Sequence, residues 1–390
     1  MKRKYMKMRV RLRRMEKRSV LEAVIKLLLV LGFLYMFLVS IGLMGAAFKG
    51  FGKGFAETLL SSTSNSFVGL FIGILATSLV QSSSTTTSIV VGMVASGVLG
   101  IGNAIPIMMG ANIGTTVTNT MVSIGHITRR EEFRRAVAGS TVHDFFNLIC
   151  VSIMFPLELA TGFLEKSATM LSGAFLNVGG VKFTSPVKTA TKPAIDMIRH
   201  FLTEDAGMTH SLGNVMVLVT SVLFLFLSLY FIVKLMKSLL VEKIESALHD
   251  VLNRSGVVAI LAGLAFTVVV QSSSITTSLL VPLLGAGVLT LETAFPITMG
   301  ANIGTTTTAI LASFAAGNQA AITIAFVHFL FNLFGVLLLY PIAIFRSIPI
   351  SLARWLGDLA FRKRRYVLAY VFSAFFLVPA LLIMVSRALR

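Results

Sequence analysis

The strings QSSSTTTS, from Gln81 to Ser88, and QSSSITTS, from Gln271 to Ser278, decide how this chain folds, because they share seven of eight residues at an offset of 190 positions. A second pair comes after them in the same order, MGANIGTTVT ending at Thr118 and MGANIGTTTT ending at Thr308, with nine of ten residues identical. All four strings lie in otherwise apolar sequence, where a buried hydroxyl or amide needs a hydrogen-bond partner. The pattern predicts an internally duplicated protein with a polar centre.

The duplication extends on both sides of the strings. It keeps the offset of 190 up to the second string, and after a shortening of five residues the offset becomes 185. The matched residues are Gly73 with Gly263, Pro106 with Pro296, His143 with His328, Asn147 with Asn332 and Pro156 with Pro341. The two units therefore cover residues 69–158 and 255–343.

The composition is that of a membrane protein. Hydrophobic residues make up 55% of the chain and charged residues only 13%, whereas soluble domains are about 25% charged. The clearest apolar runs are Leu27 to Ala47, Ser211 to Val233, Ala320 to Phe345 and Tyr366 to Val385. Each is long enough for a helix across a hydrocarbon core of about 30 Å, and the short alternating segments of an outer-membrane barrel are absent. The sequence therefore predicts an all-α polytopic membrane protein.

The net charge of +18 is concentrated at the N-terminus, since residues 1–26 hold 11 Lys or Arg and two Glu. A basic arm directly before a span is typical of a cytoplasmic anchor that contacts anionic lipid, so we expect membrane lipid and no nucleic acid as a partner. The next apolar run is too long for a cleaved signal peptide, and we expect it to stay. The single cysteine, Cys150, excludes an internal disulfide and a metal site built from several cysteines.

The placement of Lys and Arg near the span ends predicts an orientation with the N-terminus in the cytoplasm and the C-terminus outside. The two repeats then enter the membrane from opposite faces, as two inverted-topology repeats with broken helices or re-entrant hairpins. Gly179-Gly180, Pro186 and Pro193 are expected to break the outer loop between them. The expected segments are a basic cytoplasmic arm (1–26), a first span and outer loop (27–65), repeat 1 (66–160), an outer loop (161–210), a linking span and cytoplasmic segment (211–250), repeat 2 (251–345), a basic cytoplasmic loop (346–365) and a last span (366–390).

The local chemistry of the strings favours an ion site. A helix interior disfavours the run of hydroxyls from Ser82 to Thr87, so we expect a broken helix or a hairpin tip. In the second strings we expect Pro106 and Pro296 to stop a helix, the glycines at 110, 114, 300 and 304 to allow a tight turn, and Asn112 and Asn302 to cap the next helical segment. Free amides and hydroxyls can hold an anion, while carbonyl and hydroxyl oxygens can coordinate sodium.

The paired strings, together with EFRRAVAGSTVHDFFN from Glu132 to Asn147, resemble the type II sodium-dependent phosphate cotransporter family, in its bacterial or archaeal form. The resemblance implies sodium-coupled import of inorganic phosphate across the plasma (inner) membrane, with sodium bound by the same Ser, Thr, Gln and Asn groups and no organic cofactor. The phosphate- and sodium-binding residues that it implies are Gln81, Ser82, Ser83, Ser84, Thr85, Asn112, Thr115, Thr116, Gln271, Ser272, Ser273, Ser274, Asn302, Thr305 and Thr306.

One departure from the family pattern concerns coupling. Electrogenic members carry an aspartate three residues before the Glu of that segment, and this chain has Arg129 there, so we expect electroneutral transport. Asp144, with Asn147 and Asn332, is a candidate for sodium coordination or gating, and a capping or interface role is the alternative. His143 and His328 are expected to be packed, hydrogen-bonded histidines. The arginines at 129–135 are expected to set the topology rather than to attract phosphate.

We therefore expect a secondary transporter that works by alternating access. One rival is a sodium-coupled carrier of another oxyanion such as sulfate, or of a small carboxylate. The other is an intramembrane enzyme with a serine nucleophile, which is disfavoured because neither polar string contains a general base. The sodium stoichiometry, the choice between rocking and elevator motion, the selectivity against arsenate and a homodimeric state stay open.

Overall fold

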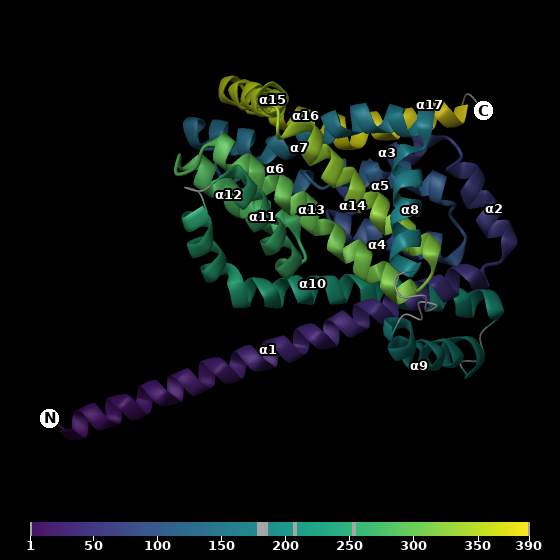
Figure 1. The fold of residues 1–390 in the computed structure, drawn as a ribbon, viewed down its shortest axis with the longest axis horizontal. Coiled ribbons are helices and arrows are strands. Elements are labelled where there is room, and N and C mark those ends of the chain that lie inside the picture. Colours follow the sequence, from purple (N-terminus) through teal and green to yellow (C-terminus); the bar gives the residue numbers. More distant parts are fainter. Residues whose placement is uncertain (1, 178–185, 206–208, 252–254, 389–390) are drawn as a thin grey trace.

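The computed structural model describes residues 2–177, 186–205, 209–251 and 255–388, and every regular element in these residues is a helix. Figure 1 shows helices packed around one body, with α1 projecting from it and the two termini far apart. The helices are α1 (Lys2–Gly50), α2 (Lys53–Ser62), α3 (Ser66–Val80), α4 (Ser83–Ser96), α5 (Ile101–Gly114), α6 (Val117–Ile124), α7 (Arg130–Thr161), α8 (Phe163–Asn177), α9 (Pro186–His200), α10 (His210–Val251), α11 (Gly256–Val270), α12 (Ser273–Gly285), α13 (Leu291–Ala316), α14 (Gln319–Leu339), α15 (Ala343–Arg362), α16 (Arg365–Phe372) and α17 (Val378–Ala388), with π-helical turns η1 (Phe201–Asp205) and η2 (Ser373–Leu377).

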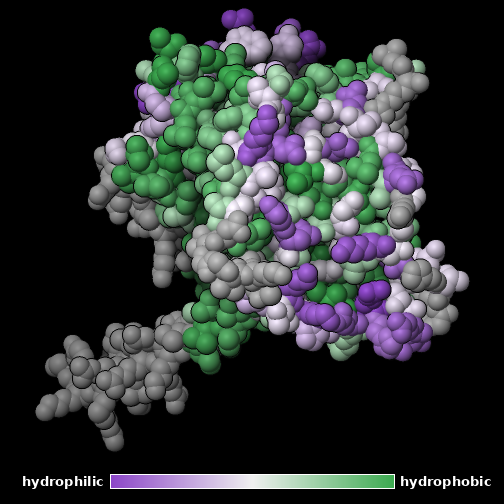
Figure 2. All heavy atoms as spheres, turned by 45° about the vertical axis from the view of Figure 1, so that its right-hand side comes forward, coloured by the Kyte–Doolittle hydropathy of each residue, from purple (hydrophilic) through white to green (hydrophobic). Residues whose placement is uncertain are grey.

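Several helices are long and apolar enough to cross a membrane. Among the described residues these are Leu21–Gly50, Arg130–Thr161, Ser211–Leu239, Gln319–Leu339 and Arg365–Ser386. Helices α2 and α3, bent by 98°, give a sixth span if they count as one, whereas α11 and α12 are apolar but short. Figure 2 shows broad hydrophobic areas on the surface beside more restricted hydrophilic ones. The chain is an all-α polytopic membrane protein.

Each QSSS string begins at a sharp turn between two short helices. Gln81 ends α3 with φ 55°, and Gln271 ends α11 with φ 58°, so both adopt the left-handed conformation that side chains other than glycine rarely take. The next residues, Ser82 and Ser272, are extended and accept a hydrogen bond from the backbone N–H three positions on. The helices therefore break as predicted, and the hydroxyls after Ser82 and Ser272 form the first turns of α4 and α12.

Matched glycines bring the helices of each repeat into close contact. A Cβ on Gly110 would lie 2.0 Å from the Leu70 carbonyl oxygen, and a Cβ on Gly300 would lie 1.9 Å from the Ile260 carbonyl oxygen. Only glycine fits at such an approach, as is common where helices pack in membranes. Helix α3 thus packs on α5, and α11 packs on α13 in the same way.

These contacts correct the expectations for the second strings. Pro106 and Pro296 lie inside α5 and α13 and do not stop them, and the glycines at 110, 300 and 304 serve close packing between helices rather than a turn. Gly114 also packs closely, and it ends α5 directly before the turn at Thr115-Thr116. Neither Asn112 nor Asn302 caps a helix, since both lie inside these helices and their side chains bond to distant residues.

Contacts between helix ends define two faces of the molecule. We call the first the Asn318 face, where Asn318 Nδ2 donates to the Ala95 carbonyl at 2.6 Å, Asn214 Nδ2 to the Gly50 carbonyl at 3.1 Å and Asn65 Nδ2 to Ser386 Oγ at 3.3 Å. We call the second the Arg135 face, where Arg135 Nε donates to the Gly285 carbonyl at 2.9 Å, Arg134 pairs with Asp358 at 2.7 Å and Arg364 donates to the Thr128 carbonyl at 3.4 Å. In Figure 1, α2 and the C-terminus lie on the right of the body, and α12 and α15 lie on its left.

The α3–α4 hairpin has its open end on the Asn318 face, because Asn65 precedes α3 and Ala95 lies near the end of α4. The α11–α12 hairpin has its open end on the Arg135 face, because Gly285 ends α12 there and Gly256, which begins α11, lies against Tyr340.

Two other expectations need adjustment. The apolar run from Ala320 to Phe345 does not form one helix, because α14 ends at Leu339 and Pro341 lies in the break before α15. The segment 161–210 contains α8 and α9, and Pro193 lies inside α9 rather than at a break. Gly179-Gly180 lies outside the described residues.

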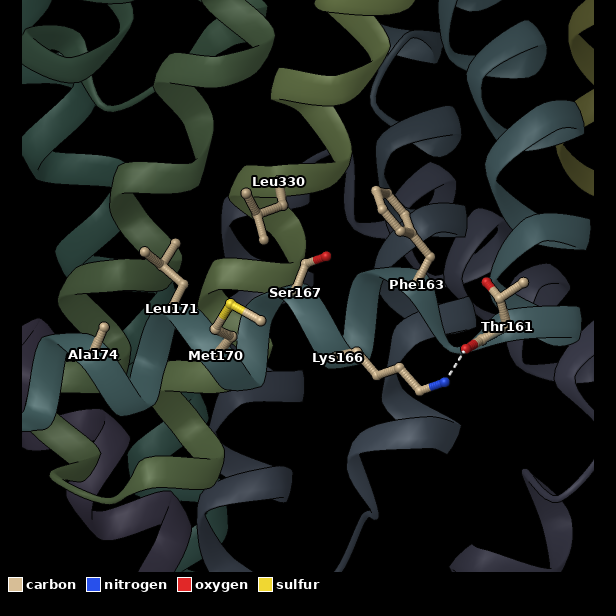
Figure 3. Close-up of a pocket in the computed structure, with 8 residues that line it drawn as sticks. All are labelled: Thr161, Phe163, Lys166, Ser167, Met170, Leu171, Ala174 and Leu330. Carbon is tan, nitrogen blue, oxygen red and sulfur yellow. Dashed lines mark hydrogen bonds between the residues drawn. The ribbon is translucent and has the colours of Figure 1, made fainter.

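Helix α8 packs along α14. Leu164 and Ala168 are fully buried, and Ser172 Oγ lies 2.8 Å from Thr323 Oγ1. A mainly apolar groove of about 610 Å³ runs along α8 and reaches Leu330 of α14, as Figure 3 shows. Its cation, Lys166, turns away and donates to the Thr161 carbonyl at 2.7 Å. This face is therefore suited to apolar surroundings such as lipid.

Candidate functional site

Asn112 of repeat 1 is held by two residues of repeat 2. Its Nδ2 donates to Asn332 Oδ1 at 2.9 Å, and its Oδ1 accepts from His328 Nε2 at 2.9 Å. His328 and Asn332 are four positions apart on α14, so they share one face of that helix. All three side chains are buried. The amide therefore has a donor partner and an acceptor partner in a single neighbouring helix.

The equivalent asparagine of repeat 2 is held in the same way by repeat 1. Asn302 Nδ2 donates to Asn147 Oδ1 at 2.7 Å, and Asn302 Oδ1 accepts from His143 Nε2 at 2.8 Å. His143 and Asn147 again lie four positions apart, here on α7. We call these six residues the reciprocal network. The histidines are packed and hydrogen-bonded, as expected, and each holds the asparagine of the other repeat in the same way. The amide nitrogens of Asn147 and Asn332 differ, because the first donates to the Asn112 carbonyl and the second to the His328 carbonyl.

Hydroxyl groups of the two strings meet beside this network. Thr308 Oγ1 lies 3.0 Å from Gln271 Oε1 of its own repeat and 3.5 Å from Ser84 Oγ of the other repeat. A second contact joins a helix of repeat 1 to the hairpin of repeat 2. Asn119 of α6 accepts hydrogen bonds from Thr277 at 2.9 Å and from Ser278 at 3.1 Å, both on α12. Helices α4 and α12 thus contact α13 and α6, each across the boundary between the repeats. The structure therefore brings together polar residues from three of the four strings, and Asn119, which directly follows the fourth string, contacts α12.

The exposure of the strings differs. Gln81 is exposed and Ser82 is half-buried, whereas every residue from Ser83 to Ser88 is buried. In repeat 2, Ser274 and Ser278 keep partial exposure. Ser274 is thus more accessible than its equivalent Ser84, whereas Ser273 is buried like Ser83.

Some buried hydroxyls have no hydrogen-bond partner within the described residues, namely those of Thr77, Ser88 and Thr118. Their equivalents in repeat 2 include Thr267, which bonds to Thr276 at 2.9 Å, and Thr308, which is bonded as above. An unpartnered buried hydroxyl costs free energy, so its retention is consistent with a ligand that pairs with it.

Other predicted site residues bond locally. The hydroxyls of Thr115, Thr116, Thr305 and Thr306 donate to carbonyls three or four positions earlier in the chain, those of Ala111, Ile113, Ala301 and Ile303. This is the usual local pattern of Ser and Thr in a helix. These threonines lie next to the reciprocal network in the chain, and their bonds to carbonyls stay within one repeat.

Asp144 is fully buried and lies one residue after His143. Its Oδ2 accepts from the Tyr370 hydroxyl at 3.1 Å, and the Thr116 side chain lies against the same carboxyl group. Its Oδ1 has no partner within the described residues. A buried carboxylate with one free oxygen is a candidate ligand for a cation.

The arginines after position 128 lie in an ionic cluster on the Arg135 face. Arg129 pairs with Glu132 at 2.8 Å, and Arg134 pairs with Glu131 at 3.5 Å as well as with Asp358. Arg354 pairs with Glu292 across the same face. These cations are therefore engaged by carboxylates on the Arg135 face and are not part of the reciprocal network.

Sequence reasoning missed Asn119, Thr277, Thr308 and Tyr370 as site residues. Asn119 lies seven positions after Asn112, and this spacing would return it to the same side of a continuous helix. Thr308 is the last residue of the string MGANIGTTTT, so its place in the repeated sequence could have marked it as a site residue. Tyr370 lies in a different span, and nothing local in the sequence links it to Asp144.

The chain matches the family described as Na+/Pi-cotransporter over residues 36–181 and 223–341. It is similar to the sodium-dependent phosphate transport protein 2B of Pongo abelii, with 36% identity over 92% of this chain and 65% of that protein, and to that of Homo sapiens, with 36% identity over 91% and 64%. The 2A protein of Rattus norvegicus is 36% identical over 93% of this chain and 68% of its own length. The chain therefore spans only part of these relatives. No solved structure matches it. The extent of these matches shows that the chain belongs to the Na+/Pi-cotransporter family.

Proposed function

We propose that this protein is a sodium-coupled secondary transporter that imports inorganic phosphate. The family and the relatives carry the names of both ions. The reciprocal network carries the proposal structurally, because Asn112 and Asn302 are each held by a His–Asn pair of the opposite repeat. A site divided equally between two repeats suits a protein that opens alternately to two sides.

The two repeats are proposed to be inverted in the membrane. The support is that the α3–α4 hairpin opens on the Asn318 face and the α11–α12 hairpin on the Arg135 face. We propose that the Arg135 face is cytoplasmic, because it holds the cluster Arg362-Lys363-Arg364-Arg365 and the arginines at 129–135. The N-terminus is then inside and the C-terminus outside, in a plasma (inner) membrane.

The proposed substrate site consists of the two QSSS strings with Asn112, Asn302 and their neighbouring threonines. Hydroxyls and amides can donate to phosphate oxygens, and their oxygens can coordinate sodium. Sodium offsets the negative charge of phosphate in a site of low dielectric constant, so each ion raises the affinity for the other. Sodium and phosphate are both cargo, and no covalent chemistry is needed.

Electroneutral coupling is part of the proposal. Arg129 stands at the position where the electrogenic pattern has an aspartate, so this position offers no carboxylate for an additional sodium ion. The Arg129 side chain is three-quarters exposed and is paired with Glu132. Asp144 is then the carboxylate best placed to take part in coupling, since it is buried and has one unpartnered oxygen within the described residues. Asp144→Asn should raise the KM for sodium more than the KM for phosphate, and an unchanged sodium KM would argue against this role.

Uptake of labelled phosphate into proteoliposomes tests the function directly. We expect uptake that requires an inward sodium gradient and that is lost when choline replaces sodium. Stronger competition by sulfate than by unlabelled phosphate would favour a carrier of another oxyanion. Current recording on the same membranes tests the coupling, since a robust inward current would contradict electroneutral transport.

A further inference from the structure

A cavity of about 530 Å³ lies on the Asn318 face, apart from the reciprocal network. Its lining includes four cationic side chains and one carboxylate, which together leave an excess of positive charge. These side chains are Lys49, Lys188, Lys192, Arg199 and Asp196. We propose that this cavity is a capture site for an oxyanion, which, if the proposed function holds, is phosphate arriving from outside.

The cations are held in place because α9 is docked firmly on α1. Ile195 of α9 lies so close to Gly42 of α1 that a Cβ on this glycine would be 2.2 Å from the isoleucine Cδ1 atom. The Tyr35 hydroxyl donates to the Ala190 carbonyl at 3.2 Å, which gives a second attachment. Residues 188, 192 and 199 recur at the spacing of one helix face, and this face borders the cavity.

The cavity lies at the ends of α4 and α13, two helices that carry polar strings. Ala95 near the end of α4 and Ala315 near the end of α13 both line it. The same two helices bring Ser84 and Thr308 together at 3.5 Å. At 1.5 Å per residue, Ser84 lies about 16 Å along α4 from Ala95. Val91 and Ala312 are fully buried on these helices, so packed side chains occupy this stretch of the two helices in the structure.

A different role for the same cations is to stabilise helix ends. Helices α1, α4 and α13 all end beside the cavity, and Lys49 lies in the last turn of α1. Cations there interact favourably with the carbonyl ends of helices. That role predicts changes in thermal stability. Anion capture predicts changes in the KM for phosphate that weaken with added salt, because the attraction is electrostatic.

The charge at position 192 can be varied without changing the backbone. The single native cysteine, Cys150, is buried, so Lys192→Cys introduces one reactive thiol. Labelling with a cationic, a neutral or an anionic methanethiosulfonate reagent then gives three charges at one site. We expect the KM for phosphate to rise in that order, by roughly two- to fivefold in all, with little change in maximal rate. The differences should shrink when choline chloride is added at fixed sodium.

Two further variants serve as controls. Asp196→Asn removes the carboxylate that pairs with Lys192 at 2.7 Å, and it should lower the KM for phosphate. Lys166→Cys, outside the cavity on α8, should show no charge dependence with the same reagents. If the three charges at position 192 give one KM while the unmodified protein takes up phosphate, or if only the melting temperature changes, the capture site is wrong. If the unmodified protein takes up no phosphate, the proposed function itself fails.

Discussion

The two QSSS hairpins have nearly the same sequence and the same turn, yet their side chains meet different surroundings. Gln271 accepts a hydrogen bond from Thr308, whereas Gln81 is exposed. The equivalent of Thr308 in repeat 1, Thr118, has no partner within the described residues. The duplicated sequence thus determines the turn, and the neighbouring helices determine what each polar group contacts.

The helices after the hairpins also differ between the repeats. In repeat 1 the second string is divided between α5 and α6 at Thr115-Thr116, whereas α13 is continuous through Thr305 and Thr306. Repeat 1 carries Asp144 where repeat 2 carries Phe329. The divided helix and the carboxylate both belong to repeat 1. The shared asparagines thus link the two repeats, whereas the divided helix and the buried carboxylate occur in repeat 1 and lack an equivalent in repeat 2.

The largest expected effect concerns the matched glycines that allow close helix packing in both repeats. Gly110→Ala and Gly300→Ala should each destabilise the protein by about 3 kcal/mol, because the new Cβ would overlap a backbone carbonyl that cannot move aside. Thermal unfolding in detergent and the yield of monodisperse protein measure this. Gly173→Ala is the control, since a Cβ there meets nothing within 4 Å. If only one of the two substitutions were harmful, the packing of the repeats would not be equivalent.

The next effect concerns the reciprocal network. Asn112→Ala leaves His328 and Asn332 without their partner, and Asn302→Ala does the same to His143 and Asn147. We expect each to cost about 2 kcal/mol and to abolish uptake. Asn103→Ala, which removes long hydrogen bonds near a helix end, is the matched control. Full uptake by either network variant would show that the two halves of the network are not equally needed.

A smaller effect should separate the two hairpins. Thr308→Val removes hydrogen bonds to Gln271 and Ser84 and should lower stability by about 1 kcal/mol. Thr118→Val removes a hydroxyl that is unpartnered within the described residues, so its stability should be unchanged or higher. Unfolding curves and sodium dependence of uptake are measured for both. A stable Thr118→Val protein with weakened sodium dependence would assign this hydroxyl to an ion, and a clear loss of stability would contradict the comparison.

The smallest effect concerns the one position at which QSSSTTTS and QSSSITTS differ, Thr85 and Ile275. Thr85 donates to Ser82 Oγ at 2.9 Å, a bond that Ile275 cannot make to Ser272. Ile275→Thr should therefore change stability by no more than about 0.5 kcal/mol and leave uptake intact. A strong loss of uptake would mean that the isoleucine has a role that the threonine in repeat 1 does not share.

Local features were predictable from the sequence where the repeat itself held the information. The duplicated polar strings predicted the helix breaks at Gln81 and Gln271, and the offset of 185 paired His143 with His328, whose contacts in the structure are equivalent. The role of the glycines was predicted wrongly. Gly110 and Gly114 are spaced four apart, as are Gly69 and Gly73, and this spacing is typical of close helix packing in membranes rather than of a turn.

Contacts between residues far apart in the chain could not be predicted from the sequence. Asn112 and Asn332 are 220 positions apart, and no local preference indicates which amide meets which. The break at Pro341 was missed because hydropathy does not register the lost backbone donor of a proline. Tyr370 could not be linked to Asp144 because the contact depends on how the last span packs on α7.

The glycine contacts between α3 and α5 also bear on the stability of short helices in the membrane. Helices α3 and α11 each have 15 residues, a length of about 22 Å, which is shorter than the hydrocarbon core of about 30 Å. Each ends at a left-handed glutamine where the chain turns back, so neither helix crosses the hydrocarbon core by itself. We therefore expect α3 to be stable in the membrane only together with α5, and α11 only together with α13, because α5 and α13 supply their closest contacts.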